Sequence, residues 1–257
     1  LFRALEKYVC HNSTAIEPES LNIFRFAVSE GLYRENKGEV IWNGSACGVD
    51  PVKFDIGRKD EWRREIRSKY GIGADDFVYG FAARLTRDKG IEELLEAYRQ
   101  SDLPGTRLLL MGGMDNEESI RKDLLDWAKS SPQVILAGRV DDINRHYAAL
   151  DAFISPSYRE GFGLVLIEAQ AMGLPVIATD VPGQIDAFIP GTTGLAVPVK
   201  NSRAILEAMK RLAGDEGLCL RMGSAAHEYA VGSYEQKELF RRIKEKREYL
   251  IKESRNA

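Results

Sequence analysis

The sequence predicts an α/β fold: a doubly wound parallel sheet with helices on both faces. From about residue 77 onward, short apolar segments alternate with amphipathic stretches. The apolar segments are continuous rather than alternating with polar residues, which is typical of parallel strands buried on both faces. With 44% hydrophobic and 29% charged residues, the composition is ordinary for a globular protein that buries a sizeable core.

Five strands are predicted in this unit, at residues 77–83, 108–111, 134–137, 152–155 and 175–178. The residues between them have apolar side chains at helical spacing. Ile91, Leu94, Leu95 and Tyr98, for example, fall at i, i+3, i+4 and i+7. The same spacing predicts helices around residues 120–128, 142–150 and 164–172. Ligands of such sheets bind outside the carboxyl ends of the strands, so the loops that follow strands are the candidate sites.

The two ends of the chain differ from this unit. Residues 1–38 contain two helical segments around an apolar stretch, and residues 40–42 predict the strand that opens the main domain. The predicted organisation is a remnant of another domain at 1–38, a main domain at 39–232 and a terminal helix at 233–257. The first residue is Leu1 rather than Met, from which we expect a truncated chain.

Composition excludes several classes of protein. Lys and Arg number 36 and Asp and Glu 39, and this formal charge of −3 argues against a dedicated nucleic-acid binder. No apolar stretch approaches the roughly 18 residues of a membrane-spanning helix, and the start lacks a signal-peptide pattern. Cys10, Cys47 and Cys219 have no spacing typical of disulfide frameworks or zinc sites. A cytoplasmic location is therefore expected.

The first candidate site is the cationic loop after the strand at 77–83. It contains Arg84 and Lys89 and ends at Gly90, where the next helix begins. Fixed cations beside a helix N-terminus favour an anion, and a diphosphate is the obvious one. The alternative, that both are solvated loop charges, has about even weight on this segment alone.

The second candidate site follows the strand at 152–155. Gly161 and Gly163 flank Phe162, so the backbone can approach a ligand closely at the start of the next helix. Glu160 precedes that helix and Glu168 lies about one turn inside it, and two such carboxylates can accept hydrogen bonds from sugar hydroxyls. Alternatively, Glu160 complements the helix dipole and Glu168 is solvated.

A third segment, from Asp180 to Asp186, also lies between a strand and a short helix. Its backbone and carboxylate could join the same cleft, but a turn with a capping acid is the favoured interpretation. The sequence has neither a GxGxxG motif after a strand nor a GxxxxGK[ST] motif, which argues against a standard dinucleotide site or P-loop. No cluster of metal ligands is evident.

These motifs together resemble glycosyltransferase family 4, retaining nucleotide-sugar transferases of the GT-B fold. The two glutamates, Glu160 and Glu168, lie eight positions apart with glycines between them and match the Glu-x7-Glu signature of that family. The segment from Asn43 to Asp50 is similar to bacterial capsular and exopolysaccharide members. The resemblance covers about residues 40–199 and implies a Rossmann-like donor-binding domain, the second of two in a complete enzyme.

The resemblance implies a catalytic set and its roles. Arg84 and Lys89 would bind the nucleotide diphosphate and stabilise it as leaving group. Glu160 would hold the donor sugar and Glu168 the ribose hydroxyls. The family often has Glu where this chain has the shorter Asp186.

Further donor-binding residues follow from the same resemblance. Residues 161–164 (Gly161, Phe162, Gly163 and Leu164) would contact the sugar or the phosphate, and Arg139 and Val140 would frame the base. The family generally needs no divalent metal, because basic side chains and a helix N-terminus neutralise the leaving phosphate. No cofactor is therefore expected.

The predicted function is transfer of a sugar from a nucleotide, by default UDP, in bacterial surface polysaccharide biosynthesis, with this chain as the donor-binding part. The fragment alone is expected to be inactive, and the acceptor, a saccharide or lipid-linked saccharide, would bind mainly to the missing domain. The alternatives are a GT-B sugar-nucleotide epimerase or phosphorylase, and a non-catalytic sugar-nucleotide-binding module. An epimerase would need acid/base groups in the cleft and a phosphorylase a pyridoxal lysine; neither is evident.

The last segment, residues 237–257, carries eight basic and four acidic side chains. A solvated helix face is the favoured interpretation. The alternative is that the apolar stripe of Leu239, Phe240, Ile243 and Leu250 packs on residues 1–38 while the basic face lies near anionic lipid. The enzyme would then be peripheral at the inner face of the plasma membrane.

Overall fold

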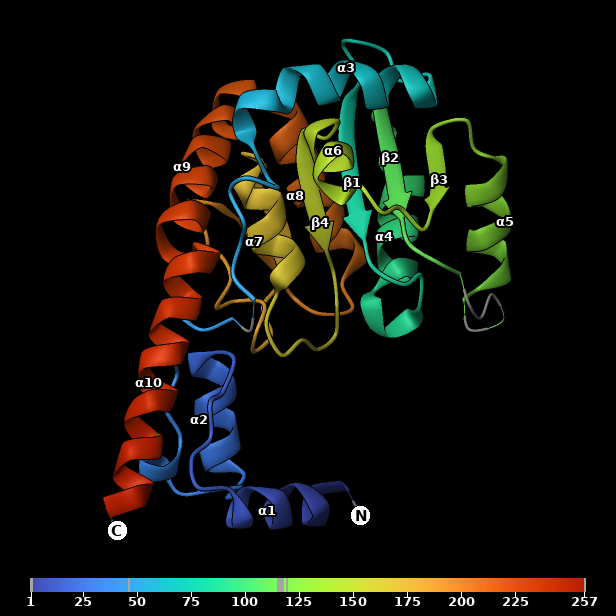
Figure 1. Cartoon of the computed structure of the whole chain (residues 1–257). Coiled ribbons are helices and arrows are strands. Elements are labelled where there is room, and N and C mark those ends of the chain that lie inside the picture. Colours follow the sequence, from blue (N-terminus) through green and yellow to red (C-terminus); the bar gives the residue numbers. More distant parts are fainter. Residues whose placement is uncertain (1, 46, 115–117, 119, 257) are drawn as a thin grey trace.

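The computed structural model describes residues 2–45, 47–114, 118 and 120–256 (Figure 1). Its centre is a six-stranded sheet in the order β3-β2-β1-β4-β5-β6, and every neighbouring pair is parallel. The strands are β1 Phe77–Ala82, β2 Thr106–Met111, β3 Val134–Gly138, β4 Ala152–Ser155, β5 Val176–Thr179 and β6 Gly194–Val197. The predicted doubly wound parallel sheet is confirmed, with β6 as a strand that the apolar runs did not predict.

The strand predicted at residues 40–42 is wrong. Trp42 lies in a turn with φ 55°, and the Gly44 N–H donates to the Ile41 carbonyl at 3.0 Å. A side chain on Gly44, where φ is 90°, would place its Cβ only 2.3 Å from the Glu19 carbonyl oxygen. The segment therefore turns sharply past Glu19 and joins no sheet edge, although its residues favour strands.

Helices cover both faces of the sheet. One hydrophobic cluster joins the sheet to α4 Ile91–Arg99, α5 Lys122–Ser130 and α8 Ser202–Gly214. The other joins it to α3 Lys59–Tyr70, α6 Ile143–Ala148, α7 Leu164–Ala171 and α9 Glu216–Tyr234. Side chains alternate between the clusters along β2, where Leu108 and Leu110 face one and Leu109 the other. We call residues 49–234, which these clusters hold together, the sheet unit.

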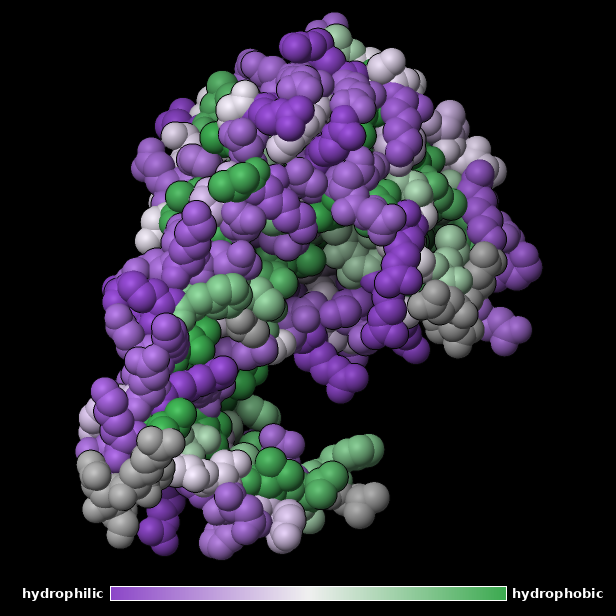
Figure 2. Space-filling view, in the orientation of Figure 1, coloured by the Kyte–Doolittle hydropathy of each residue, from purple (hydrophilic) through white to green (hydrophobic). Residues whose placement is uncertain are grey.

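The remaining helices lie beyond the carboxyl ends of the strands. They are α1 Phe2–Asn12, α2 Leu21–Ser29 and the long α10 Gln236–Asn256, with 3-10 turns η1 Glu35–Lys37, η2 Ile56–Arg58 and η3 Arg87–Lys89 elsewhere. Figure 1 shows α2 beside α10, and α1 projecting away from both. We call residues 2–38 the N-terminal lobe. The surface is hollowed between this lobe and the sheet unit (Figure 2).

The predicted stripe on α10 is packed only in part. Leu239 is fully buried and Ile243 is half-buried beside Glu17 and Pro18, whereas Phe240 is 48% exposed. Five of the eight basic residues form ion pairs with carboxylates; they are Arg241, Arg242, Lys244, Lys246 and Arg247. Most of the basic face is therefore paired with carboxylates of the chain, and two of these, Glu17 and Glu39, lie outside α10.

Candidate functional site

The candidate site lies where the strand order reverses. The chain runs outward from β1 through β2 to β3, then returns and runs from β4 to β6 on the other side. β1 and β4 are neighbours, with Tyr79 opposite Ala152, so the topological switch point, where ligands of such sheets bind, lies at their carboxyl ends; we call the region outside these two ends the crevice. The loops that follow β1 and β4 carry the first two predicted constellations, so the fold brings both to one edge of the sheet.

Lys89 and Glu160 meet in this crevice. The Lys89 ammonium donates to Glu160 Oε1 at 2.6 Å, and the side chains are 20% and 21% exposed. Partial burial weakens solvent screening of this pair, while one side remains open to a ligand. The two residues predicted to bind different parts of a donor therefore neutralise each other.

The loop after β1 is shaped by its contact with the loop after β4. Gly90 has φ 70°, and a Cβ there would lie 2.1 Å from the Pro156 carbonyl oxygen. The Tyr158 N–H donates to the Asp88 carbonyl at 2.9 Å. Only glycine fits this approach, so Gly90 lets η3 pack on the second loop and places Lys89 at Glu160.

The glycine loop before α7 is held by the loop after β5. The Gly163 N–H donates to the Gly183 carbonyl at 3.2 Å, and a Cβ on Gly183 would meet the Glu160 carbonyl oxygen at 2.3 Å. Phe162 is only 8% exposed, with its ring centroid 5.3 Å from that of Tyr234. Its side chain belongs to the core, as half-buried Leu164 largely does, so backbone groups are what these residues offer a ligand.

Glu168 lies one turn inside α7 and is half-buried. Burial raises the pKa of its carboxyl to about 7, and Lys53 and Tyr147 oppose this shift. The Tyr147 hydroxyl is itself buried without a hydrogen-bond partner of normal geometry among the described residues. This carboxylate is poorly solvated, so hydrogen bonds donated by the hydroxyl groups of a ligand would stabilise it.

The other predicted residues do not contact the Lys89–Glu160 pair directly. Arg84 follows β1, is exposed and forms no ion pair within the described residues. Arg139 is exposed and Val140 half-buried at the carboxyl end of the edge strand β3, which β2 separates from β1. At a strand spacing of about 4.8 Å, this places them roughly 10 Å to one side of the crevice.

Asp186 closes a turn and joins the two parts of the chain. Its carboxylate accepts from the Gly183 N–H at 3.1 Å and from the Asn22 amide of α2 at 2.9 Å. The interpretation that the sequence favours is a turn with a capping acid before a short helix; the turn is confirmed, but residues 181–188 form turns and bends and no helix, so there is no helix N-terminus to cap. Sequence reasoning missed the contact with Asn22, and also Glu19, whose Oε2 would lie 2.7 Å from a Cβ on Gly161. Neither Asn22 nor Glu19 stands in a motif that could have indicated this.

The described part of the chain contains neither a cluster of metal ligands nor a membrane-spanning helix. No group of three or more His, Cys, Asp or Glu side chains there could hold a metal ion. None of its helices has the length and apolar character needed to cross a bilayer.

Comparisons with known proteins identify similar sequences and folds. The family model described as glycosyl transferases group 1 matches residues 63–229. The capsular polysaccharide biosynthesis glycosyltransferase CapM of Staphylococcus aureus is 30% identical over 253 residues, which cover 97% of this chain and 65% of that protein. The chain thus spans slightly less than two thirds of that relative.

Solved structures share the fold. A glycosyltransferase from Rickettsia africae superposes with a TM-score of 0.85 at 23% identity, covering 97% of this chain and 67% of that one. Anabaena Alr3699/HepE, solved in complex with UDP, gives 0.82 at 22% identity, covering 92% of this chain and 64% of that one. At these identities the likeness concerns the Rossmann-like GT-B fold alone.

Proposed function

We propose, from the premise that the chain belongs to the glycosyl transferases group 1 family, that it is the nucleotide-sugar donor-binding part of a retaining transferase. The product would be a bacterial surface polysaccharide. The observation that carries this proposal is the Lys89–Glu160 pair, at 2.6 Å, in the crevice between β1 and β4. The likeness to CapM supports the polysaccharide, and UDP in the HepE structure supports a uridine nucleotide.

On binding, the diphosphate of the donor would replace Glu160 as the ion-pair partner of Lys89. A diphosphate carries more negative charge than one carboxylate, so it competes with Glu160 for the Lys89 ammonium. Glu160, released from that pair, would accept hydrogen bonds from the hydroxyls of the sugar. Arg84, which has no ion pair among the described residues, lies in the same loop and would add a second cation at the phosphates.

The transfer step follows from these positions. The bond between the anomeric carbon and the diphosphate oxygen breaks, and its electron pair stays on the diphosphate. Lys89 and Arg84 stabilise this growing charge, and such stabilisation is usually the largest contribution to catalysis. The acceptor hydroxyl oxygen forms the new bond to the anomeric carbon, and its proton passes to the departing diphosphate oxygen. The acceptor site would lie mainly outside this chain. No metal or other cofactor enters this scheme, because the cations and backbone supply the neutralisation.

Glu168 would bind the ribose. Its half-buried carboxylate sits one turn into α7, and two ribose hydroxyls would supply the donors that it lacks. Arg139 and Val140 are the proposed frame of the base, and residues 161–164 offer backbone groups to the sugar or phosphate. The group 1 family favours transfer over the epimerase, phosphorylase and non-catalytic alternatives.

Calorimetric titration with UDP tests the proposal. The double variant Arg84→Ala/Lys89→Ala should lose measurable UDP binding, because both cations that face the diphosphate are gone. The matched control is Arg203→Ala/Lys210→Ala, which removes two cations from α8 and should bind as the parent does. Unchanged affinity in the first variant would remove the basis of this proposal.

A further inference from the structure

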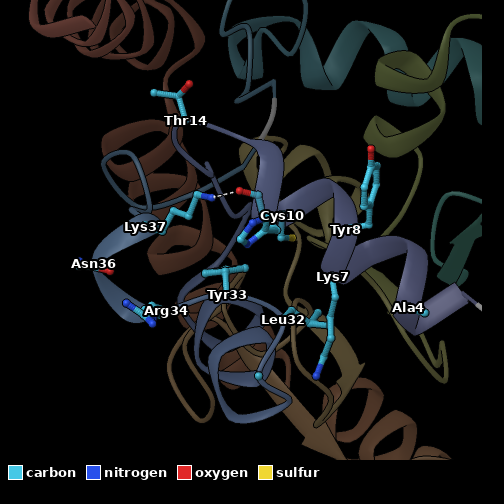
Figure 3. A pocket seen from close by; sticks show the side chains of 12 residues that line it. Ala4, Lys7, Tyr8, Cys10, Thr14, Leu32, Tyr33, Arg34, Asn36 and Lys37 are labelled. Atoms are coloured by element: carbon cyan, nitrogen blue, oxygen red, sulfur yellow. Dashed lines mark hydrogen bonds between the residues drawn. The ribbon is translucent and has the colours of Figure 1, made fainter. Parts of the chain in front are cut away.

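The N-terminal lobe offers charged side chains at two places. One is the hollow between α1 and residues 31–37, where Lys7 and Arg34 point in different directions and so do not converge on one ligand (Figure 3). The other is the segment before α2, where Glu19 extends toward the glycine loop, residues 161–163. This second place brings a carboxylate of the lobe to a residue of the proposed donor site, Gly161.

The backbone of Glu19 is held in place by its neighbours. Its carbonyl oxygen accepts a hydrogen bond from the Ser45 N–H at 2.7 Å. The next residue, Ser20, is fully buried and caps α2, with its hydroxyl oxygen accepting from the Ile23 N–H at 3.2 Å. The side chain of Glu19 therefore extends from a defined position.

The carboxylate of Glu19 is not engaged by the described part of the chain. The side chain is exposed and forms neither an ion pair nor a hydrogen bond there. Glu17, two residues earlier, is by contrast paired with Arg247 at 2.6 Å. Glu19 lies instead against the glycine loop, with its Oε2 2.7 Å from the position that a Cβ would take on Gly161.

The side of Gly161 that faces Glu19 has room for a ligand. Gly161 is exposed and its φ is not positive, so its backbone conformation does not require glycine. Among the described atoms outside its chain neighbours, those within 4 Å of a Cβ there belong to the Glu19 carboxylate. At Gly163, by contrast, a Cβ would meet the packed side chains of Leu166 and Ala187. The missing side chain at Gly161 thus leaves space between an exposed backbone and an unpaired carboxylate.

We propose that Glu19 is a sugar-binding residue of the donor site, contributed by the N-terminal lobe. This inference rests on the proposed function, in which Glu160 and residues 161–164 contact the donor sugar. A sugar ring carries several hydroxyls, and each carboxylate can accept hydrogen bonds from more than one of them. Glu160, which precedes Gly161, and Glu19, which faces it, accept from different hydroxyls of one ring. Their positions then help to decide which sugar binds.

Calorimetric titration with UDP, UDP-glucose, UDP-galactose and UDP-N-acetylglucosamine tests this role. At least one of the three sugar nucleotides should bind the parent more tightly than UDP does. In Glu19→Ala the ratio of these two affinities should fall by about tenfold, because a charge-assisted hydrogen bond to the sugar is lost. UDP affinity itself should not fall, because Glu19 does not contact the nucleotide. Glu19→Gln keeps an oxygen acceptor without the charge and should lose less.

Glu17→Ala is the matched control, because it removes a carboxylate of the same segment that Arg247 already holds. It should leave all four affinities unchanged. A sugar preference that is absent from the parent, or equal in the parent and Glu19→Ala, would overturn the role of Glu19 but leave UDP binding and the proposed function standing. A parallel loss of UDP affinity in Glu19→Ala would also overturn it, since that loss indicates a structural effect. A parent that does not bind UDP would overturn both proposals.

Discussion

The sheet unit and the N-terminal lobe are held together by different forces. The sheet unit buries two hydrophobic clusters, one on each face of the sheet. In the lobe the apolar face of α1 is exposed, with Phe2 at 86%, Leu5 at 58%, Tyr8 at 68% and Val9 at 52%, and Figure 2 shows hydrophobic side chains gathered there. The contacts between the lobe and the rest of the chain include polar ones, such as Asn22 with Asp186 and Glu17 with Arg247.

The two regions therefore differ in how much they contribute to folding and in which side chains they expose. Apolar burial supplies most of the free energy of folding, so the sheet unit has what it needs to hold its own shape. The lobe instead presents cations and apolar side chains at its surface. The sheet unit would thus fix the loops after β1 and β4 rigidly, while the lobe leaves these side chains accessible at its surface.

The largest effect is expected on the free energy of unfolding when one leucine from each region is replaced by alanine. Leu109→Ala removes a fully buried side chain from the middle of β2 and should cost about 3–5 kcal/mol of unfolding free energy. Leu5→Ala, in exposed α1, should change it by less than about 0.5 kcal/mol. Urea unfolding followed by circular dichroism measures both. A cost above about 1 kcal/mol at Leu5 would mean that the α1 face is packed in solution.

The contrast between the regions also explains what the sequence could predict. Leu108 to Met111 form a strand because each side chain is buried in the sheet, so an apolar run is enough to identify it. Val40 to Trp42 are equally apolar, but a close approach to Glu19 turns the chain there. The strand β6 is as short as β4 and β5, which the sequence predicts, but it begins at Gly194 and includes exposed Ala196, so its apolar run is weaker.

The candidate site likewise has features that the sequence predicts and features that it does not. Arg84, Lys89, Glu160 and Glu168 follow strands or begin helices, so topology alone places them at one sheet edge. The ion pair between Lys89 and Glu160 depends on how closely two loops pack at Gly90, which no spacing in the sequence encodes. The Asn22–Asp186 contact joins residues 164 positions apart and is equally hidden.

A smaller effect is expected at Glu168, within the sheet unit. The pKa of its carboxyl is about 7 in the folded chain, against 4.5 for a freely solvated glutamate, so protonation stabilises the folded chain below pH 4.5. That contribution is lost as pH rises through 7. Glu168→Gln, which mimics the protonated form, should therefore raise stability at pH 8 by up to about 3 kcal/mol and change it little at pH 4.

Urea unfolding at the two pH values measures this difference, and UDP titration at pH 8 completes the test. The variant should bind UDP more weakly, because a neutral amide accepts hydrogen bonds from ribose less well than a carboxylate. A gain in stability with unchanged UDP affinity would support the effect of burial on the pKa of Glu168. The same result would contradict its proposed role in binding the ribose. A pH-independent change in stability would contradict the burial argument itself.

The smallest effect concerns the joint between the two regions. The Asn22 amide donates to Asp186 at 2.9 Å across that joint, while the Asn144 amide donates to the Lys53 carbonyl at 2.8 Å within the sheet unit. Each bond is worth about 1 kcal/mol if the regions unfold as one unit, so Asn22→Ala and Asn144→Ala should destabilise the chain about equally in urea. If only Asn144→Ala does so, the lobe detaches before the sheet unit unfolds, because a contact already broken cannot affect the main transition. That outcome would make the lobe a separately mobile element beside a rigid sheet unit.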